Sequence, residues 1–215
     1  MKIVGISDTH GRDVYSPIPD GDVLVHAGDA CMRGTESELV LFNAWLGTLP
    51  HKHKLYTPGN HDGFVQDHPE EARAILTNCT LLIEEAVEID GVKFWMSPYT
   101  PEFFDWSFMY ERANGAEQWA KMPEGIDVLV THGPPAGILD TVLRFNKGEY
   151  EPESTGCYDL LQRVLKVQPK LHIFGHIHEG YGQQIQHGIK FVNASICTDR
   201  YRAINAAHVL ELEKS

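Results

Sequence analysis

The sequence predicts an α/β protein of two mixed β-sheets covered by helices. Three observations lead to this class. Short β-branched runs alternate with segments of helical spacing, extra short strands follow the first alternations, and the second half of the chain repeats the same order. The length of 215 residues suits one domain, 1–215, with a substantial core.

The first half is expected to hold three strands and two helices. The runs 2–7 and 22–28, and the run 53–60 that ends in a turn, predict the strands. Residues 36–47 carry apolar side chains at near-helical spacing and end on a glycine, which indicates a helix. Residues 69–78 open with a proline and two acids, which favour a second helix start.

Short strands and an aromatic loop are expected in the middle of the chain. Strands are predicted at 81–84, 86–90 and 92–96, and the Asp-Gly pair at 90–91 predicts a hairpin between the last two. The segment 94–112 is rich in aromatic residues without a regular period, which is typical of a long packed loop. We expect most of its rings in the core, while a substrate-pocket wall and a dimer contact are the alternatives.

The second half is expected to repeat the alternation of strand and helix. Residues 126–135 predict a strand that runs into a Gly-Pro-Pro turn. Residues 154–169 predict a capped amphipathic helix that ends at a proline. The runs 171–178, 189–195 and 204–212 predict the last strands.

Charge and composition disfavour several classes of protein. The formal net charge is −12 and no basic cluster is present, which disfavours a nucleic acid or an acidic membrane surface as a partner. No run is long enough to span a bilayer and the first residues lack a secretory pattern, which indicates a cytoplasmic protein. The four cysteines form no C-x-x-C pair and are expected to be reduced and buried.

Five predicted strands end in polar residues that can bind metal ions or substrates. In open α/β sheets the carboxyl ends of the strands form the ligand-binding edge, so these endings are expected to meet. Chance explains one such ending easily and five poorly. The residues are Asp8 and His10, Asp29, Asn60, His61 and Asp62, His132, and His176 and His178.

The endings form five short motifs in a specific order. They are D-T-H at 8–10, G-D at 28–29, G-N-H-D at 59–62, T-H-G-P-P at 131–135 and G-H-I-H at 175–178. This set resembles the pattern of the calcineurin-like metallophosphoesterase superfamily. Longer stretches, such as DVLVHAGD and LHIFGHIHEGYG, are similar to its MPPED-type subfamily of metallophosphoesterase domain-containing proteins.

The resemblance implies a four-layer α-β-β-α sandwich and a binuclear metal centre. Carboxylate and imidazole donors without thiolate suit two divalent transition-metal ions, with Mn expected first and Fe, Zn, Ni or Co also compatible. The implied ligands are Asp8, His10 and His178 for one ion, Asn60, His132 and His176 for the other, and Asp29 as the bridge between them.

Further residues receive roles from the same resemblance. His61 is expected to contact the phosphate or the leaving group as a catalytic residue, with Asp62 orienting it. Asn60 is expected to contact the phosphate as well. Arg12 is also expected to reach the phosphate because it follows the D-T-H-G stretch, and an exposed arginine without a role is the alternative. The implied reaction is hydrolysis of phosphodiesters, cyclic nucleotides among them, through in-line attack by a metal-bridging hydroxide.

Three other functions compete with this interpretation. A phosphomonoesterase would use the same centre. A nuclease is disfavoured by the acidic charge, and a non-enzymatic metallophosphoesterase-like scaffold should show broken ligand motifs, whereas these are intact. The expected partner is a small phosphorylated substrate such as a nucleotide, and the chain is expected to be a monomer or a homodimer.

Overall fold

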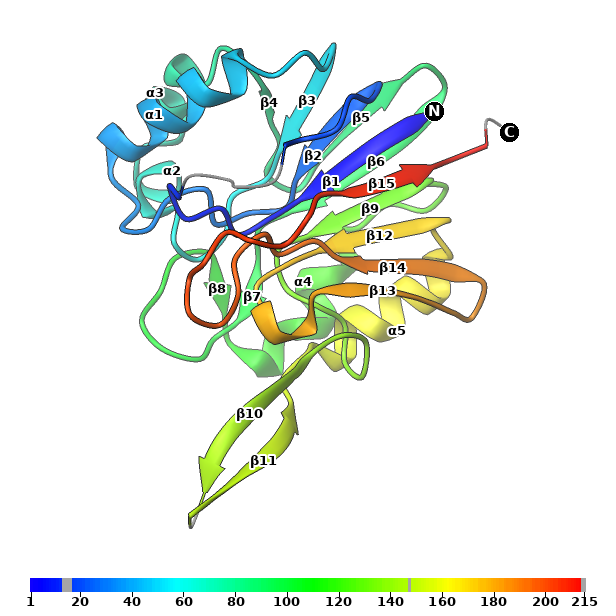
Figure 1. Cartoon of the computed structure of the whole chain (residues 1–215). Helices are drawn as coiled ribbons and strands as arrows, with labels where there is room; N and C mark the ends of the chain where they lie inside the picture. Colours follow the sequence, from blue (N-terminus) through cyan, green and yellow to red (C-terminus); the bar gives the residue numbers. More distant parts are fainter. Residues whose placement is uncertain (13–16, 147, 214–215) are drawn as a thin grey trace.

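Two β-sheets face each other in the middle of the protein, and helices cover the outer face of each sheet (Figure 1). The computed structural model describes residues 1–12, 17–146 and 148–213. The order of layers is helix, sheet, sheet, helix, which confirms the predicted fold class.

The first sheet has five strands in the order β15-β1-β2-β3-β4. The strands from β1 to β4 run parallel, and β15 pairs antiparallel with β1. All carboxyl ends of the parallel strands therefore lie at one edge. The strands are β1 (Lys2–Ile6), β2 (Val23–His26), β3 (His53–Tyr56), β4 (Thr80–Leu81) and β15 (His208–Glu211).

The second sheet has six strands in the order β13-β14-β12-β9-β6-β5. Its four inner strands are parallel, and the two edge strands are antiparallel to their neighbours. Asp90 and Gly91 have left-handed backbone (φ 49° and 82°), which confirms the predicted hairpin turn. The strands are β5 (Glu85–Ile89), β6 (Val92–Ser97), β9 (Val128–Thr131), β12 (Leu171–Phe174), β13 (Gly182–Gln186) and β14 (Ile189–Asn193).

The helices pack on the outer faces of the sheets. Leu39 and Phe42 of α1 share an apolar cluster with Leu24 of the first sheet, and Leu160 of α5 shares another with Phe174 of the second sheet. The helices are α1 (Glu36–Gly47), α2 (Gly63–Asp67), α3 (Pro69–Ile75), α4 (Gly115–Ala120) and α5 (Tyr158–Val167), with 3-10 turns η1 (Arg112–Asn114) and η2 (His178–Gly180).

Side chains of β1 show how the layers are held together. Successive side chains of a strand point to opposite faces. Ile3 therefore packs in the core between the two sheets, while Val4 and Ile6 pack under the helices. Burial on both faces explains why this strand is a continuous apolar run and not an alternating one.

The segment before α5 differs from the prediction. The predicted helix start at residue 154 is wrong, because α5 begins at Tyr158 and Cys157 caps it by accepting the Leu160 N–H at 3.3 Å. The preceding residues form a hairpin of β10 (Thr141–Asn146) and β11 (Glu149–Ser154), which projects from the body (Figure 1). Other short elements outside the prediction are β7 (Thr100–Pro101), β8 (Met109–Tyr110), α2, α4 and β13.

The remaining expectations concern cysteines and membrane spans. All four cysteines are free, and Cys31, Cys157 and Cys197 are buried as expected, whereas Cys79 is partly exposed and differs from the prediction. Across the described ranges, no helix combines the length and the apolar character that crossing a membrane requires.

Candidate metal centre

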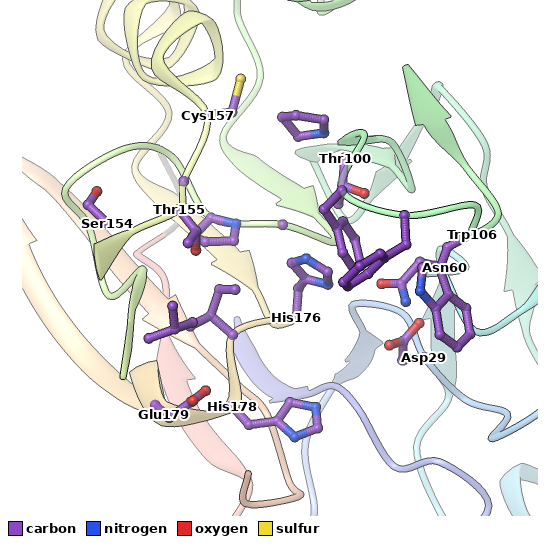
Figure 2. Close-up of a pocket in the computed structure, with 18 of the residues that line it drawn as sticks. Asp29, Asn60, Thr100, Trp106, Ser154, Thr155, Cys157, His176, His178 and Glu179 are labelled. Carbon is purple, nitrogen blue, oxygen red and sulfur yellow. The ribbon is translucent and has the colours of Figure 1, made fainter. Parts of the chain in front are cut away.

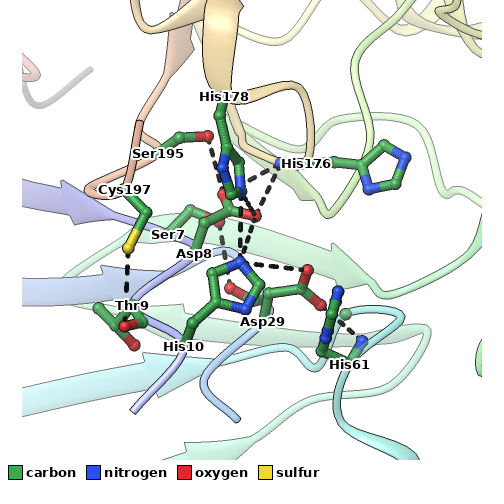
Figure 3. A network of polar contacts seen from close by, with 12 residues as sticks. Ser7, Asp8, Thr9, His10, Asp29, His61, His176, His178, Ser195 and Cys197 are labelled. Carbon is green, nitrogen blue, oxygen red and sulfur yellow. Dashed lines mark hydrogen bonds and ion pairs between the residues drawn. The ribbon is translucent and has the colours of Figure 1, made fainter. Parts of the chain in front are cut away.

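Polar side chains from five strand ends meet at one rim of the two sheets. The parallel strands β1, β2 and β3 of the first sheet and β9 and β12 of the second all end there. A bridge between Ser7 and Ser195 joins the two sheets beside the rim. Figure 3 shows the polar contacts among several of these residues, which lie far apart in the sequence.

The first group of donors consists of Asp8, His10 and His178, whose ligand atoms all lie within 4.8 Å of one another. His178 Nε2 is 3.4 Å from Asp8 Oδ1, and His10 Nε2 is 4.0 Å from the same oxygen. The two histidine Nε2 atoms are 3.2 Å apart (Figure 3). Two nitrogens and one carboxylate oxygen thus surround a single point.

The second group consists of Asp29, His132 and His176, again within 4.8 Å. His132 Nε2 lies 3.3 Å from Asp29 Oδ1 and 2.9 Å from Asn60 Oδ1. The amide oxygen of Asn60 therefore joins this group as a further donor. The structure brings together all the residues that the resemblance assigns to the second ion.

Asp29 lies between the two groups. Its Oδ1 belongs to the second group, whereas its Oδ2 is 3.8 Å from His10 Nε2 of the first group. A carboxylate that offers one oxygen to each side has the geometry of a bridging ligand. Nearby, the ligand atoms of His10, Asp29 and His61 also lie within 4.8 Å of one another.

The donor chemistry fits divalent metal ions. Nδ1 of His10, His132 and His178 faces a backbone carbonyl, that of Cys31, Ala27 and Thr198 respectively, at 2.9–3.1 Å. A carbonyl only accepts, so each Nδ1 carries the hydrogen and each Nε2 presents its lone pair to the site. Lone pairs of His10 and His178 that face each other at 3.2 Å need a cation or a proton between them.

The raised pKa values of two histidines also show that the carboxylates of the site favour a positive charge beside them. Burial disfavours the charged form of His132, but the neighbouring Asp29 carboxylate outweighs it and raises the pKa of His132 to about 9. Burial likewise opposes protonation of His178, and the contact with Asp8 raises its pKa to about 9. Metal ions compete with protons for such nitrogens.

Asp8 is held in place by a hydroxyl group and a backbone N–H. The Ser195 hydroxyl donates to Asp8 Oδ2 at 2.8 Å, and the His176 backbone N–H donates to the same oxygen at 3.0 Å. Oδ1 also accepts this N–H, at 3.1 Å, and it faces the nitrogens of the first group. Ser195 carries no motif signature and was not predicted, because it follows β14 by two residues in an ordinary strand-end sequence.

The backbone at the site adopts conformations that most residues avoid. Asp8, His10, Asp29 and His176 all have positive φ values, from 47° to 69°. This conformation costs energy for residues with a Cβ atom, and it persists only where the surrounding structure holds it in place. Such residues are often found at functional sites. It turns the chain directly after each strand and directs the side chains toward the rim.

Two glycines allow the segments to approach closely. A Cβ atom on Gly59 would lie 2.3 Å from Asp29 Oδ1, and one on Gly175 would lie 2.0 Å from Asp8 Oδ2. Both contacts are with carboxylates that the site fixes in place. Any larger residue at either position would therefore displace a donor.

His61 stands at the edge of the donor groups, partly exposed. Its Nδ1 lies 2.7 Å from the Met32 carbonyl, and its ring packs against Trp106 with centroids 4.4 Å apart. Its backbone N–H donates to Asp29 Oδ1 at 2.8 Å. The Met32 carbonyl and the Trp106 ring therefore fix the imidazole, and Nε2 is the nitrogen left free.

The expectation that Asp62 orients His61 is corrected by these contacts. The buried Asp62 carboxylate accepts backbone N–H groups of Gly59 at 2.7 Å and Cys31 at 2.9 Å, so it is already occupied. Burial and the nearby Asp29 charge raise the pKa of Asp62. Asp62 ties together the loops that follow β2 and β3, which carry Asp29 and Asn60.

A cavity of about 640 Å³ opens above the donors, and Figure 2 shows the residues around it. Aromatic residues of the 94–112 segment divide between core and cavity. Phe94 and Trp95 are buried, as expected for most rings, whereas Phe103 and Trp106 line the cavity with 41% and 43% of their surface exposed. Tyr201, which was not predicted, closes another side with its ring 4.9 Å from that of His10.

Arg12 does not lie with the cavity residues. It is exposed and lines a neighbouring hollow with Arg33 and Trp45, so the structure does not bring it to the expected phosphate contact. The cavity is instead lined by Arg112 and Arg144, two cations that no motif indicates.

A four-layer sandwich that gathers histidine, aspartate and asparagine donors at the ends of its parallel strands defines the metallophosphoesterase class of folds. The sequence profile of calcineurin-like phosphoesterases matches residues 1–180. Human metallophosphoesterase domain-containing protein 1 is 39% identical, over 98% of this chain and 71% of its own. A Caenorhabditis elegans UPF0046 protein is 41% identical, over 92% and 70%. The chain therefore belongs to the calcineurin-like phosphoesterase family.

Solved structures agree on the fold. A Thermus thermophilus protein matches with a TM-score of 0.54 and 14% identity, over 89% of this chain and 88% of its own. A structure described as a novel archaeal phosphodiesterase matches with a TM-score of 0.50 and 18% identity, over 98% and 93%. Members of the family are phosphoric ester hydrolases that use divalent metal ions.

Proposed function

We propose that the protein hydrolyses phosphodiesters at a centre of two divalent metal ions. The observation that carries this proposal is the pair of donor groups that share Asp29. One ion would be held by Asp8, His10 and His178, the other by Asn60, His132 and His176. Bound there, the ions would polarise the phosphoryl oxygens and activate a water for in-line attack.

Charge supports phosphate as the group that binds. Two divalent ions would bring four positive charges, which the carboxylates of Asp8 and Asp29 reduce by two, while amide and imidazole donors are neutral. The centre would be locally positive on a chain of formal net charge −12. Mn suits the mixed oxygen and nitrogen donors, and Fe, Zn, Ni and Co remain compatible.

His61 is proposed to act on the leaving group. Its Nδ1 hydrogen is engaged by the Met32 carbonyl, so Nε2 is the atom that can donate a proton to a departing oxygen. The Trp106 ring holds the imidazole in that orientation. Asp62 supports the reaction only by position, through the loops that it ties together.

The preference for diesters over monoesters is tested with matched substrates. We expect the metal-loaded protein to hydrolyse bis(4-nitrophenyl) phosphate with a higher kcat/KM than 4-nitrophenyl phosphate, because the cavity above the metal centre has room for a second ester group. Both reactions release the same phenolate, so the comparison isolates the second substituent. Faster hydrolysis of the monoester would support the phosphomonoesterase alternative.

Replacing His178 is expected to damage the centre more than the fold. In His178→Gly the first ion loses one of four donors, counting the bridging Asp29, and its affinity should fall by about a hundredfold. Activity at limiting metal should fall by about tenfold to a hundredfold. The unfolding free energy of the metal-free protein should fall by about 1–3 kcal/mol, because the largely buried contact with Asp8 is lost. The apolar clusters that hold the layers together do not include His178, so the protein should still fold.

The control for this variant is Glu179→Gly in the same turn. It introduces the same backbone freedom beside an exposed side chain and should retain two metal ions per chain. Calorimetric metal titration and urea unfolding of both variants separate the two effects. A His178→Gly protein that binds both ions with wild-type affinity would contradict the ligand assignment.

A further inference from the structure

The cavity extends well beyond the donors of the metal centre. Figure 2 shows it running from Asp29 and Asn60 past His176 to Thr155 and Cys157. A phosphoryl group would fill only the end beside the donors. The other end, next to the start of α5, is therefore available for the organic part of a substrate.

Arg112 lines this distant part with a largely unengaged guanidinium. Its nitrogens lie 3.4 and 3.5 Å from the carbonyl oxygens of Gly156 and Thr155, at the upper limit for hydrogen bonds. Over the residues that the structure describes, no carboxylate forms an ion pair with Arg112. A guanidinium has five N–H donors, so most of them can serve a ligand.

Arg144 provides a contrast within the same cavity. Its guanidinium is paired with the carboxylate of Glu153 on the neighbouring strand. The charge of Arg144 is therefore balanced inside the hairpin. Of the two arginines among the described residues that line the cavity, Arg112 is the one without a carboxylate partner.

The loop beneath Arg112 is held by a buried acid. The Asp140 carboxylate accepts the backbone N–H groups of Gly137 at 2.9 Å and Gly156 at 3.0 Å, and also the hydroxyl of Ser154. The carbonyls on which Arg112 rests are thus fixed relative to the rim. A fixed platform gives a charged subsite a defined distance from the metal centre.

Acidic and apolar residues set the orientation of a ligand. Glu179 and Asp199 line the cavity on the side of His178 and would repel an anionic group there (Figure 2 shows Glu179). Phe103 and Ile177 line the wall nearer to His176. An anionic group beyond this apolar wall is attracted by Arg112.

We propose that Arg112 forms a subsite for a second anionic group, a carboxylate or phosphate carried by the organic part of the substrate. The inference rests on the proposed phosphoesterase function and names the substrate class of that site. Arginine suits the task because its planar fork can contact two oxygens of a carboxylate or phosphate together. The substrate class is a phosphate ester with a second acid at the far end of an apolar spacer.

The test uses alkyl 4-nitrophenyl phosphates in pairs, one with a terminal carboxylate and one with a methyl group, and with spacers of two to six carbons. Each pair releases the same nitrophenolate. In the metal-loaded protein, the carboxylate should raise kcat/KM by about fivefold to tenfold at one spacer length. Arg112→Gln should remove this preference, Arg112→Lys should keep part of it, and Arg144→Gln should retain it.

A binding measurement separates this inference from the proposed function. Calorimetric titration with ω-carboxyalkyl phosphonates and matched alkyl phosphonates needs no turnover. If no ester is hydrolysed but the carboxylate tightens phosphonate binding in an Arg112-dependent way, the phosphoesterase proposal fails and the subsite stands. If esters are hydrolysed but no spacer length gives a preference, or if the preference survives Arg112→Gln, the subsite is refuted.

Discussion

Removing the metal ions from the purified protein is expected to lower phosphoester hydrolysis by at least about a thousandfold, because ions at such centres supply several kcal/mol of transition-state stabilisation. Two carboxylates and four histidines converge at the rim, and none of them alone can activate a water as the ions would. Re-addition of Mn should restore the activity as two equivalents bind. Metal content and rate are measured on the same samples.

The fold must be shown to survive metal removal. Circular dichroism of the metal-free protein should be unchanged, since three apolar clusters hold the layers together away from the rim. Added metal should raise the melting temperature, because a ligand that binds only the native state stabilises it. Full activity of protein verified to be free of metal would refute the metal-dependent mechanism.

The sequence was most informative where buried strands end. Apolar runs such as 2–7 and 171–174 predict strands because their side chains are buried on both faces. The parallel order brings the polar endings of each sheet to one edge. The edges of the two sheets meet at the rim, so Asp8 of the first sheet and His176 of the second lie near each other. In the structure the His176 N–H does contact Asp8.

Other features depend on contacts that a local pattern does not encode. Ser195 reaches Asp8 because a bridge between Ser7 and Ser195 joins the two sheets, which brings residues 187 positions apart together. The Asp62 carboxylate was expected at His61, but three-dimensional packing places it against loop N–H groups. The same holds for Arg112, whose neighbours come from a loop more than forty residues away.

The β10–β11 hairpin shows a different limit. Its residues alternate in a strand-like way, yet the next residues carry the periodicity of α5, and the boundary between the two patterns was placed too early. Cys157, which is a poor predictor of a helix cap by residue type, caps the helix with its sulfur. Helix boundaries that depend on unusual caps are therefore hard to place from periodicity alone.

Replacing His61 by alanine is expected to lower kcat by about a hundredfold or more while both metal ions and the fold are retained, because removing one donor to a developing charge commonly costs that much. The side chain is partly exposed and makes one hydrogen bond, to the Met32 carbonyl, so the fold depends little on it. The control is His187→Asn. His187 lies in an exposed turn with left-handed backbone (φ 54°), a conformation that asparagine tolerates.

The dependence of this loss on the leaving group identifies what His61 does. An alkoxide needs a proton as it departs, whereas nitrophenolate scarcely does. If Nε2 of His61 donates that proton, His61→Ala should slow an alkyl ester more than a nitrophenyl ester. Equal losses on both would leave His61 with phosphate positioning only. Loss of one metal ion in the variant would instead show that His61 is a metal ligand. The metal content must therefore be measured, because the ligand atoms of His61, His10 and Asp29 lie within 4.8 Å of one another.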